Sequence, residues 1–195
     1  MKYAIVGTGG RHQMFRNAIA ESYAGANDLV ALCDVNEKRL ALAAGKVPKK
    51  GNGIATYAPA EFNRMIAEQQ PDTVIVTTPD FVHHEYIIAA LKAGRHVMTE
   101  KPMTVDLDKL RQILEAQRES GKNVTVTFNY RYTPARTQVK ELLMSGAIGE
   151  IEAVDFRWYL DRVHGADYFR RWHRYKEKSG GLLVHKSTHH FDLMN

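Results

Sequence analysis

The sequence predicts an α/β protein: a doubly wound parallel sheet, followed by the beginning of an α+β domain with an open sheet. Two observations predict it. Up to residue 128, short apolar runs rich in Val, Ile and Thr alternate with segments of helical periodicity, which is the pattern of a parallel sheet covered by helices on both faces. Beyond residue 128 this alternation ends. We therefore expect a first domain over residues 1–128 and the start of a second, incomplete domain over residues 129–195.

Each element of the first domain follows from its local sequence. The strands are nearly continuous apolar runs, as burial on both faces requires. Pro59 fits a first helical turn, and Gly94 and Gly121 fit the stops after helices. The expected strands cover residues 2–6, 28–34, 73–77, 96–99 and 123–128, with a weaker candidate at 54–57. The expected helices cover residues 13–23, 37–44, 59–68, 82–93 and 107–120.

The second domain starts with a helix expected at residues 133–145, which Gly146 stops. Residues 150–160 then alternate between two faces, which is typical of a strand in an antiparallel sheet with one solvated face. Residues 182–195 have the pattern of another helix opening. Because one strand and two helices cannot cover both faces of a new sheet, we expect the chain to be the amino-terminal piece of a longer protein.

Composition excludes several classes of protein. The 195 residues carry 27 basic and 22 acidic side chains, a net charge of +5, with the two signs mixed along the chain. Nucleic-acid-binding proteins usually show a basic stripe or arm instead. No apolar run approaches the roughly 18 residues of a membrane helix, and the apolar start ends too early, at Gly7, for a signal peptide. With Cys33 as the single cysteine, we expect a cytoplasmic protein without nucleic-acid or membrane partners.

A glycine-rich turn follows the first expected strand. A dinucleotide's pyrophosphate needs such a tight turn and a backbone free of side chains, and Gly7 and Gly9 supply them. The third glycine of Gly-x-Gly-x-x-Gly would stand at position 12, which is a histidine. Either Gly10 takes over part of its role or the helix lies farther out, and an ordinary turn is the alternative. The predicted pyrophosphate-binding residues are Gly7, Thr8, Gly9, Gly10, Arg11 and His12.

An acidic residue closes the second expected strand. Asp34 stands 25 residues beyond Gly9, where a carboxylate can accept both hydrogen bonds of an adenosine ribose diol. Because it would repel a 2′-phosphate, it favours NAD over NADP, although Arg39 nearby leaves NADP open. The alternative is that Asp34 caps a helix or lies in a loop.

Two further turns lie at the carboxyl edge of the expected sheet, where open α/β sheets bind ligands. Thr78 and Pro79 follow one strand, and Lys101 follows the next. The proline after Lys101 restrains its backbone, so its ammonium can be held in one place. The alternatives are a helix start for the first turn and a solvated surface lysine for the second.

Together with motifs downstream, these turns resemble the Gfo/Idh/MocA family of NAD(P)-dependent oxidoreductases over essentially the whole chain. The resemblance implies a Rossmann-type dinucleotide-binding domain, an open-faced sheet domain through which copies of the chain form a homo-oligomer, and hydride transfer in the cleft between the domains. The motifs that carry it are the glycine turn, Thr78-Pro79-Asp80 with His83, residues 94–97 before Glu100-Lys101-Pro102, Phe128-Asn129-Tyr130-Arg131, and Gly146-Ala147-Ile148-Gly149-Glu150-Ile151. The cofactor contacts that it adds are Thr78, Pro79, His83, Glu100, Lys101 and Asn129.

The resemblance also implies the catalytic residues. It places Lys101 beside the nicotinamide and the reacting hydroxyl, where an ammonium stabilises a developing alkoxide, and it places the catalytic histidine at His189. His185 stands where the family usually has aspartate. Positions 185 and 189 share a face of a helix, so we expect both in the cleft, with His185 neutral beside the charge of Lys101. The substrate then differs from that of commoner members or is anionic.

A sugar-like substrate is expected to meet aromatic faces and charged side chains, although packing of a sheet face and a loop is the alternative. The candidates are Tyr130, Arg131, Arg157, Tyr159 and His164. A metal site of His185, His189 and Asp192 is a rival, but the general base of a His-Glu-x-x-His motif is missing, and we expect no metal.

We therefore expect an NAD-dependent enzyme that transfers a hydride between nicotinamide and a sugar, polyol or related hydroxy or keto compound. Two alternatives remain. One is a redox-assisted glycoside hydrolase with tightly held NAD, and the other is a non-catalytic dinucleotide-binding regulatory module. The presence of Lys101 and His189 argues against the regulatory module.

Overall fold

The computed structural model describes residues 1–48 and 53–195. They form two compact units, Met1–Val126 and Thr127–Asn195, called unit 1 and unit 2 below. The sequence placed the boundary between its two domains at residues 128 and 129.

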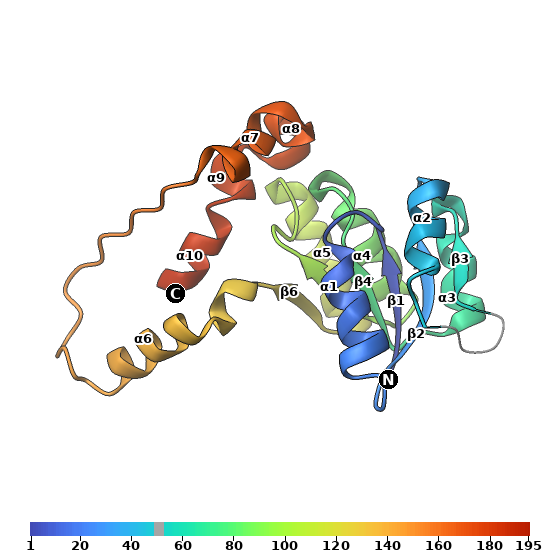
Figure 1. The fold of residues 1–195 in the computed structure, drawn as a ribbon, viewed down its shortest axis with the longest axis horizontal. Coiled ribbons are helices and arrows are strands. Elements are labelled where there is room, and N and C mark those ends of the chain that lie inside the picture. The colour runs from blue at the N-terminus through green and yellow to red at the C-terminus, as the bar shows by residue number, and fades with distance from the viewer. Residues whose placement is uncertain (49–52) are drawn as a thin grey trace. The chain divides into compact units, whose positions relative to one another are not determined.

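Unit 1 is built on a six-stranded sheet (Figure 1). Its order is β3-β2-β1-β4-β5-β6, so that the first strand lies in the middle of the sheet. The neighbours from β3 through β5 pair in parallel, and every strand expected in this part of the chain is present. The strands are β1 (Lys2–Val6), β2 (Asp28–Cys33), β3 (Ala55–Tyr57), β4 (Thr73–Val76), β5 (His96–Glu100) and β6 (Val124–Thr127).

Helices connect these strands where the sequence predicts them, and two of them match the prediction at both ends. The side chains of Asn36 and Asp106 cap these two helices by accepting hydrogen bonds from the Arg39 N–H at 3.0 Å and the Lys109 N–H at 2.9 Å. Gly121, at φ 64°, ends the longer one. The helices are α1 (His12–Asn17), continued by the π-helical η1 (Ala18–Ser22), α2 (Glu37–Ala44), η2 (Pro59–Glu61), α3 (Phe62–Gln69), η3 (Asp80–Val82), α4 (His83–Lys92) and α5 (Leu107–Ser120).

Both faces of the sheet are covered. Successive side chains of a strand point to opposite faces, so Ala4 and Val6 pack with α3, α4 and α5, whereas Ile5 packs with η1 and α2. All four residues of β4 are buried, as in a parallel strand covered on both sides. These two apolar layers hold the carboxyl ends of β1, β2 and β4 at one edge.

Unit 2 is helical beyond the end of β6. The helix expected at residues 133–145 is α6, but α7 and α8 were not predicted. The missed signal for α7 was Asp161, whose side chain caps it by accepting the His164 N–H at 2.7 Å. The helices are η4 (Asn129–Tyr132), α6 (Pro134–Met144), α7 (Arg162–Arg170), η5 (Trp172–Arg174), α8 (Lys176–Ser179), α9 (Leu182–His185) and α10 (Thr188–Met194).

The strand expected over residues 150–160 is wrong, because this segment is irregular and runs extended between α6 and α7 (Figure 1). A strand requires ladder hydrogen bonds to a neighbour, and no strand among the described residues pairs with this one. Between residues 155 and 160 the predicted alternation is still visible in the exposure of the side chains. Phe156 and Trp158 are 37% and 39% exposed, whereas Tyr159, on the other face, is 87% exposed.

Residues 182–195 form two short helices, so the expected single helix is wrong. α9 ends at His185 and α10 begins at Thr188. Serine and threonine at positions 187 and 188 are weak helix formers, and the Ser187 N–H bonds to the carbonyl of Leu182, five residues back, at 3.3 Å. His185 and His189 therefore do not share the face of one continuous helix.

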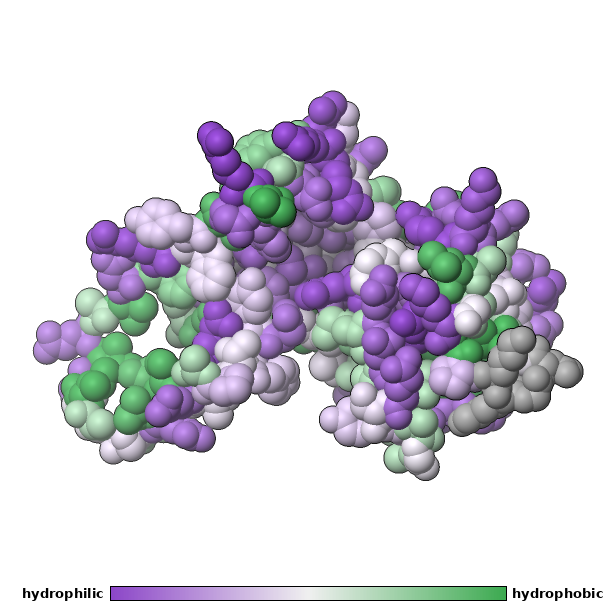
Figure 2. Space-filling view, viewed as in Figure 1, coloured by the Kyte–Doolittle hydropathy of each residue, from purple (hydrophilic) through white to green (hydrophobic). Residues whose placement is uncertain are grey.

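The helix α6 carries apolar side chains that unit 2 leaves exposed. The space-filling view shows green hydrophobic surface gathered over this helix and the chain that follows it, at the lower left (Figure 2). The exposed large apolar side chains of α6 are Val139, Leu142, Leu143 and Met144.

Candidate functional site

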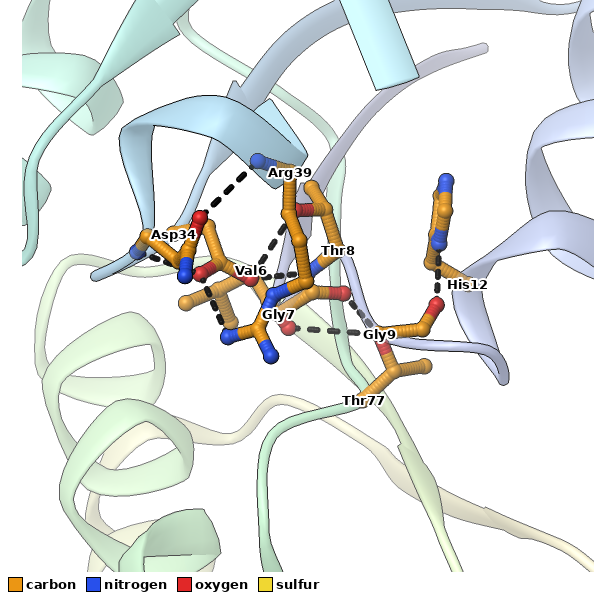
Figure 3. A network of polar contacts seen from close by, with 9 residues as sticks. Val6, Gly7, Thr8, Gly9, His12, Asp34, Arg39 and Thr77 are labelled. Carbon is orange, nitrogen blue, oxygen red and sulfur yellow. Dashed lines mark hydrogen bonds and ion pairs between the residues drawn. The ribbon is translucent and has the colours of Figure 1, made fainter. Parts of the chain in front are cut away.

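The glycine turn after β1 brings the chain against the end of β4. Gly7 has φ 93°, and a Cβ there would lie 2.6 Å from the carbonyl carbon of Thr77 and from the nitrogen of Thr78. Its N–H donates to the Cys33 carbonyl at 2.8 Å, and the Thr77 hydroxyl donates to its carbonyl at 2.5 Å. Only glycine fits this position, which ties the ends of β1, β2 and β4 together (Figure 3).

The next two glycines face open space. A Cβ at Gly9 or at Gly10 would meet no described atom within 4 Å. His12, the departure from the family pattern, is buried with its Nδ1 hydrogen-bonded to the Gly9 carbonyl, and Figure 3 shows this contact. Burial lowers the pKa of His12, against the opposing effect of that hydrogen bond. His12 therefore braces the turn from inside, and the space beside Gly9 and Gly10 remains open to a ligand.

Asp34 lies at the carboxyl end of β2 and faces the glycine turn (Figure 3). One carboxylate oxygen accepts from the Thr8 N–H and from the Thr8 hydroxyl at 2.9 Å. The other accepts from the Asn36 N–H at 2.7 Å and from the Arg39 guanidinium at 3.1 Å. Burial raises the pKa of this carboxyl, but the hydrogen bonds from Asn36, Thr8 and Arg39 outweigh it and hold the pKa below its ordinary value. An ionised carboxylate thus stands at the position expected to bind a ribose diol.

These features fit a dinucleotide. The turn has no side chain where the backbone must be approached, and a buried, ionised carboxylate lies beside it. The same Asp34 oxygens already hold Thr8 and Arg39, so the carboxylate also shapes the turn. A ribose 2′-OH would compete with Arg39, which is about half exposed, for the Asp34 carboxylate.

His83 is completely buried at the start of α4. Its Nε2 lies 2.8 Å from the Thr78 carbonyl and its Nδ1 lies 3.0 Å from the Pro102 carbonyl. Burial lowers its pKa, against the opposing effects of the Asp80 charge and of these hydrogen bonds. His83 therefore links the turn after β4 to the turn that holds Lys101, which is a positioning role. That it also contacts the cofactor remains a prediction.

The end of β5 is joined to the glycine turn by an ion pair. Arg11 Nε lies 2.9 Å from a carboxylate oxygen of Glu100, which is buried, whereas Arg11 is partly exposed. Lys101, the next residue, is also buried within unit 1. The structure therefore brings together the glycine turn, Asp34, the turn with Thr78 and Pro79, and the Glu100-Lys101 segment at one edge of the sheet.

In unit 2, His189 lies in a stack of aromatic rings. The Tyr130 ring is 4.1 Å from the His189 ring at an interplanar angle of 12°, and Phe128 meets His189 edge-on at 6.0 Å. Trp158 lies on Tyr130 at 5.6 Å. Asn129, in η4, precedes Tyr130 in the same turn. Tyr130, a predicted substrate residue, is thus a neighbour of the predicted catalytic histidine.

His185 lies in a different group of rings. Its neighbours are His173 at 4.6 Å, Tyr168 at 5.5 Å and Trp172 at 5.7 Å. His164 meets the same Tyr168, whose hydroxyl is 3.3 Å from its Nε2. The sequence placed His185 with His189, whereas the structure places them in two separate ring clusters.

Arg131 and Arg157, two other predicted substrate residues, form ion pairs, and Tyr159 is exposed. Arg131 binds Asp192 of α10, its Nε lying 2.9 Å and 2.8 Å from the two carboxylate oxygens. Arg157 pairs with its neighbour Asp155 at 2.8 Å, and Tyr159 is exposed. Asp192, the third residue of the rival metal site, thus forms an ion pair with Arg131. No group of three or more metal-ligating side chains is found among the described residues.

Sequence reasoning missed Lys186. It is 4% exposed, and its ammonium donates to the Tyr130 hydroxyl at 3.1 Å. Its position between His185 and His189, both predicted catalytic residues, was the available signal. None of the helices in the described part of the chain is long and apolar enough to cross a lipid bilayer.

Family comparison agrees with both units. The sequence model of an oxidoreductase family with an NAD-binding Rossmann fold, Gfo/Idh/MocA, matches residues 1–128. The model of the C-terminal alpha/beta domain of the same family matches residues 140–195.

Individual relatives are similar over most of this chain. YteT of Bacillus subtilis, named as an oxidoreductase, is 41% identical over 93% of the chain, which spans 42% of YteT. The D-glucoside 3-dehydrogenase of Escherichia coli is 33% identical over 77% of the chain, spanning 41% of that protein. The WlbA dehydrogenase of Bordetella pertussis, solved with NADH and UDP-GlcNAcA, covers the whole chain with a TM-score of 0.83 and 25% identity, and the chain covers 58% of it. The chain thus spans about half the length of such proteins.

Proposed function

The chain belongs to the Gfo/Idh/MocA family of NAD-binding oxidoreductases, and from this premise we propose that the full-length protein oxidises or reduces a sugar, a polyol or a related hydroxy or keto compound. The observation that carries the proposal is the edge of unit 1, where the open glycine turn, the ionised Asp34 and the buried Lys101 lie on one side of the sheet. The bound nicotinamide supplies the hydride chemistry.

The chain's own residues bind and position. Gly9 and Gly10 leave room for the pyrophosphate, and Asp34 accepts from the ribose diol, which favours NAD over NADP. Lys101 places an ammonium beside the reacting oxygen and stabilises the negative charge that develops there. His189 exchanges the proton of the substrate hydroxyl.

The substrate class is supported by names and by chemistry. D-glucoside and UDP-GlcNAcA occur in the names of two similar proteins, and both are carbohydrates. The stack of Tyr130, Trp158 and His189 offers ring faces of the kind that pack on sugar C–H surfaces. We further propose that the protein acts in the cytoplasm and that copies of it form a homo-oligomer.

The test is steady-state turnover of the full-length protein with NAD and a panel of sugars and polyols, followed by NADH absorbance. Lys101→Met keeps much of the side-chain length and removes the charge, so we expect turnover to fall with little change in NADH affinity. The matched control is Lys92→Met at the exposed end of α4, which should keep full turnover.

His189→Ala should lower turnover by about 10²–10⁴-fold, the usual contribution of a positioned general acid or base. Near-wild-type turnover in Lys101→Met or in His189→Ala would remove that residue from the proposed chemistry. NADH binding without turnover of any compound in the panel would favour a regulatory module, and glycoside cleavage without net NADH formation would favour a hydrolase.

A further inference from the structure

Lys186 is a buried lysine between α9 and α10 that the proposed chemistry does not use. Its ammonium donates to the Tyr130 hydroxyl at 3.1 Å. It also lies 5.4 Å from the centre of the Tyr130 ring and 5.9 Å from the centre of the Trp158 ring. Its surroundings in unit 2 are therefore aromatic and not acidic.

No carboxylate among the described residues forms an ion pair with Lys186. Asp192, the acidic residue of the neighbouring α10, is held by Arg131. A second cation is close, because the Arg136 guanidinium lies 4.4 Å over the Tyr130 ring and 5.5 Å over the Trp158 ring. Burying a cation without a counter-charge is strongly destabilising, so a negatively charged ligand would stabilise this arrangement.

Hydrogen-bond donors remain unused at the same place. A lysine ammonium has three N–H donors, and the Tyr130 hydroxyl takes one of them. That hydroxyl accepts from Lys186, and its own O–H has no acceptor among the described residues. Three donors and two positive charges thus surround one aromatic stack, which suits an acceptor-rich, negatively charged group.

The position of this stack relates it to the proposed reaction. Tyr130 lies flat on His189, with ring centres 4.1 Å apart. A group held by Lys186 and the Tyr130 hydroxyl would therefore belong to a ligand that also passes His189. Trp158, whose ring centre lies 5.9 Å from the Lys186 ammonium, belongs to the irregular segment 145–161.

We propose that Lys186 and Tyr130 bind an anionic group of the substrate, the carboxylate of a sugar acid or the phosphate of a sugar phosphate, while the rings of Tyr130 and Trp158 contact its C–H surface. This proposal rests on the proposed function, because it assigns the substrate class of the same site. It makes Lys186 a specificity-determining residue that selects charged sugars over neutral ones.

The experiment measures equilibrium binding to the full-length protein loaded with NADH, followed by tryptophan fluorescence. The probes are D-glucuronate, D-galacturonate, D-glucose 6-phosphate and neutral D-glucose and D-galactose. A hydrogen bond to a charged group contributes about 1.5–3 kcal/mol, which corresponds to roughly a 10–150-fold preference for an anionic sugar over its neutral counterpart. Tighter binding of a uronate identifies a carboxylate site, and tighter binding of the phosphate identifies a phosphate site.

The variants separate charge from structure. Lys186→Met should abolish the preference, Lys186→Arg should keep most of it, and Tyr130→Phe should reduce it. The matched control, Lys140→Met on the exposed face of α6, should leave it unchanged. Because the charge of Lys186 has no counter-charge in the part of the chain that the structure describes, Lys186→Met should also be at least as stable to urea as the wild type, whereas a purely structural lysine would lose stability.

The proposal is overturned if neutral and anionic sugars bind equally, if none of the anionic probes binds, or if Lys186→Met retains the wild-type preference. These outcomes are distinct from failure of the proposed function. If the wild type prefers anionic sugars but turns none of them over, the proposed binding site stands and the proposed enzyme activity fails. If it turns over neutral sugars alone, the enzyme activity stands and the anion-binding site fails.

Discussion

At Gly7 the first strand passes so close to the turn after β4 that a single added carbon would overlap the backbone of Thr77 and Thr78. We expect Gly7→Ala to lower the free energy of unfolding by at least about 2 kcal/mol, because a left-handed backbone alone disfavours alanine by about 1–2 kcal/mol and the contacts at 2.6 Å add to it. Urea unfolding measures this change.

Gly9→Ala is the matched control, because its Cβ would meet nothing within 4 Å. Its stability should stay within about 0.5 kcal/mol of the wild type, while its NADH affinity should fall, since the new methyl enters the space proposed for the pyrophosphate. Equal stability of the two variants would contradict the close approach at Gly7.

His83 gives the protein a pH-dependent stability with a definite sign. Burial lowers its pKa in the folded protein, so below the ordinary value of about 6.5 the unfolded chain binds a proton that the folded chain does not. The contribution is fully present above that pH and is lost as pH falls toward the folded-state pKa. His12 and His84, whose pKa values burial also lowers, act in the same direction.

We therefore expect urea unfolding of the wild type to show a clear loss of stability between pH 8 and pH 5. His83→Gln removes one titrating group, so its loss over that interval should be smaller, even if its stability at pH 8 is lower. Parallel pH profiles for the two proteins would show that His83 is not responsible.

At the scale of elements, the sequence predicted the ends of a helix correctly where the residues that start and stop the helix lie next to it in the chain. α2 and α5 were predicted to the residue, because their capping residues, Asn36 and Asp106, and the stop at Gly121 are local signals. Asp34 and the glycine turn were found because strand, turn and strand end have a fixed spacing. The spacing did not show that Thr8 and Arg39 bind the two different oxygens of the Asp34 carboxylate.

The strand predicted at residues 150–160 was wrong because a strand depends on residues far away in the chain. Their alternation describes a face, and Phe156 and Trp158 are less exposed than Tyr159, but a ladder depends on a partner elsewhere in the chain. The separation of His185 from His189 was missed although its signal is local, because Ser187 and Thr188 are weak helix formers and interrupt the helix between the two histidines.

Hydrogen exchange on the 195-residue chain can measure the difference in protection between the irregular residues 150–160 and a paired strand. Amides of residues 152–158 should exchange near the rate of an unstructured peptide, because no ladder protects them. Amides of β4, buried on both faces, should be slower by several orders of magnitude and serve as the internal reference. Comparable protection of both segments would show that residues 150–160 are paired after all.

At the scale of the whole molecule, the two units differ in what they bury. Every buried hydrophobic side chain of the described residues lies in unit 1, whereas the buried residues of unit 2 are Ser179, His185, Lys186 and His189. Apolar burial is the main driving force of folding. Unit 1 therefore has a core of its own, and unit 2 is held mainly by ring contacts and hydrogen bonds.

We expect a fragment of residues 1–128 to unfold in one cooperative calorimetric transition with an enthalpy on the order of 60–80 kcal/mol, as is usual for a domain of about 100 residues, and to bind NADH. A fragment of residues 127–195 should show no such transition. A cooperative transition in the second fragment, or none in the first, would contradict this division.

The central place of β1 has a consequence for synthesis on the ribosome. β1 is made well before β4, one of its two neighbours in the sheet, because the register that joins Tyr3 to Thr73 and Val6 to Val76 spans about seventy residues. At roughly 5–20 residues per second, the nascent chain carries an apolar strand with one unpaired edge for several seconds. Such edges pair with other chains. Aggregation or chaperone binding should therefore be greatest when the ribosome pauses before β4 is made.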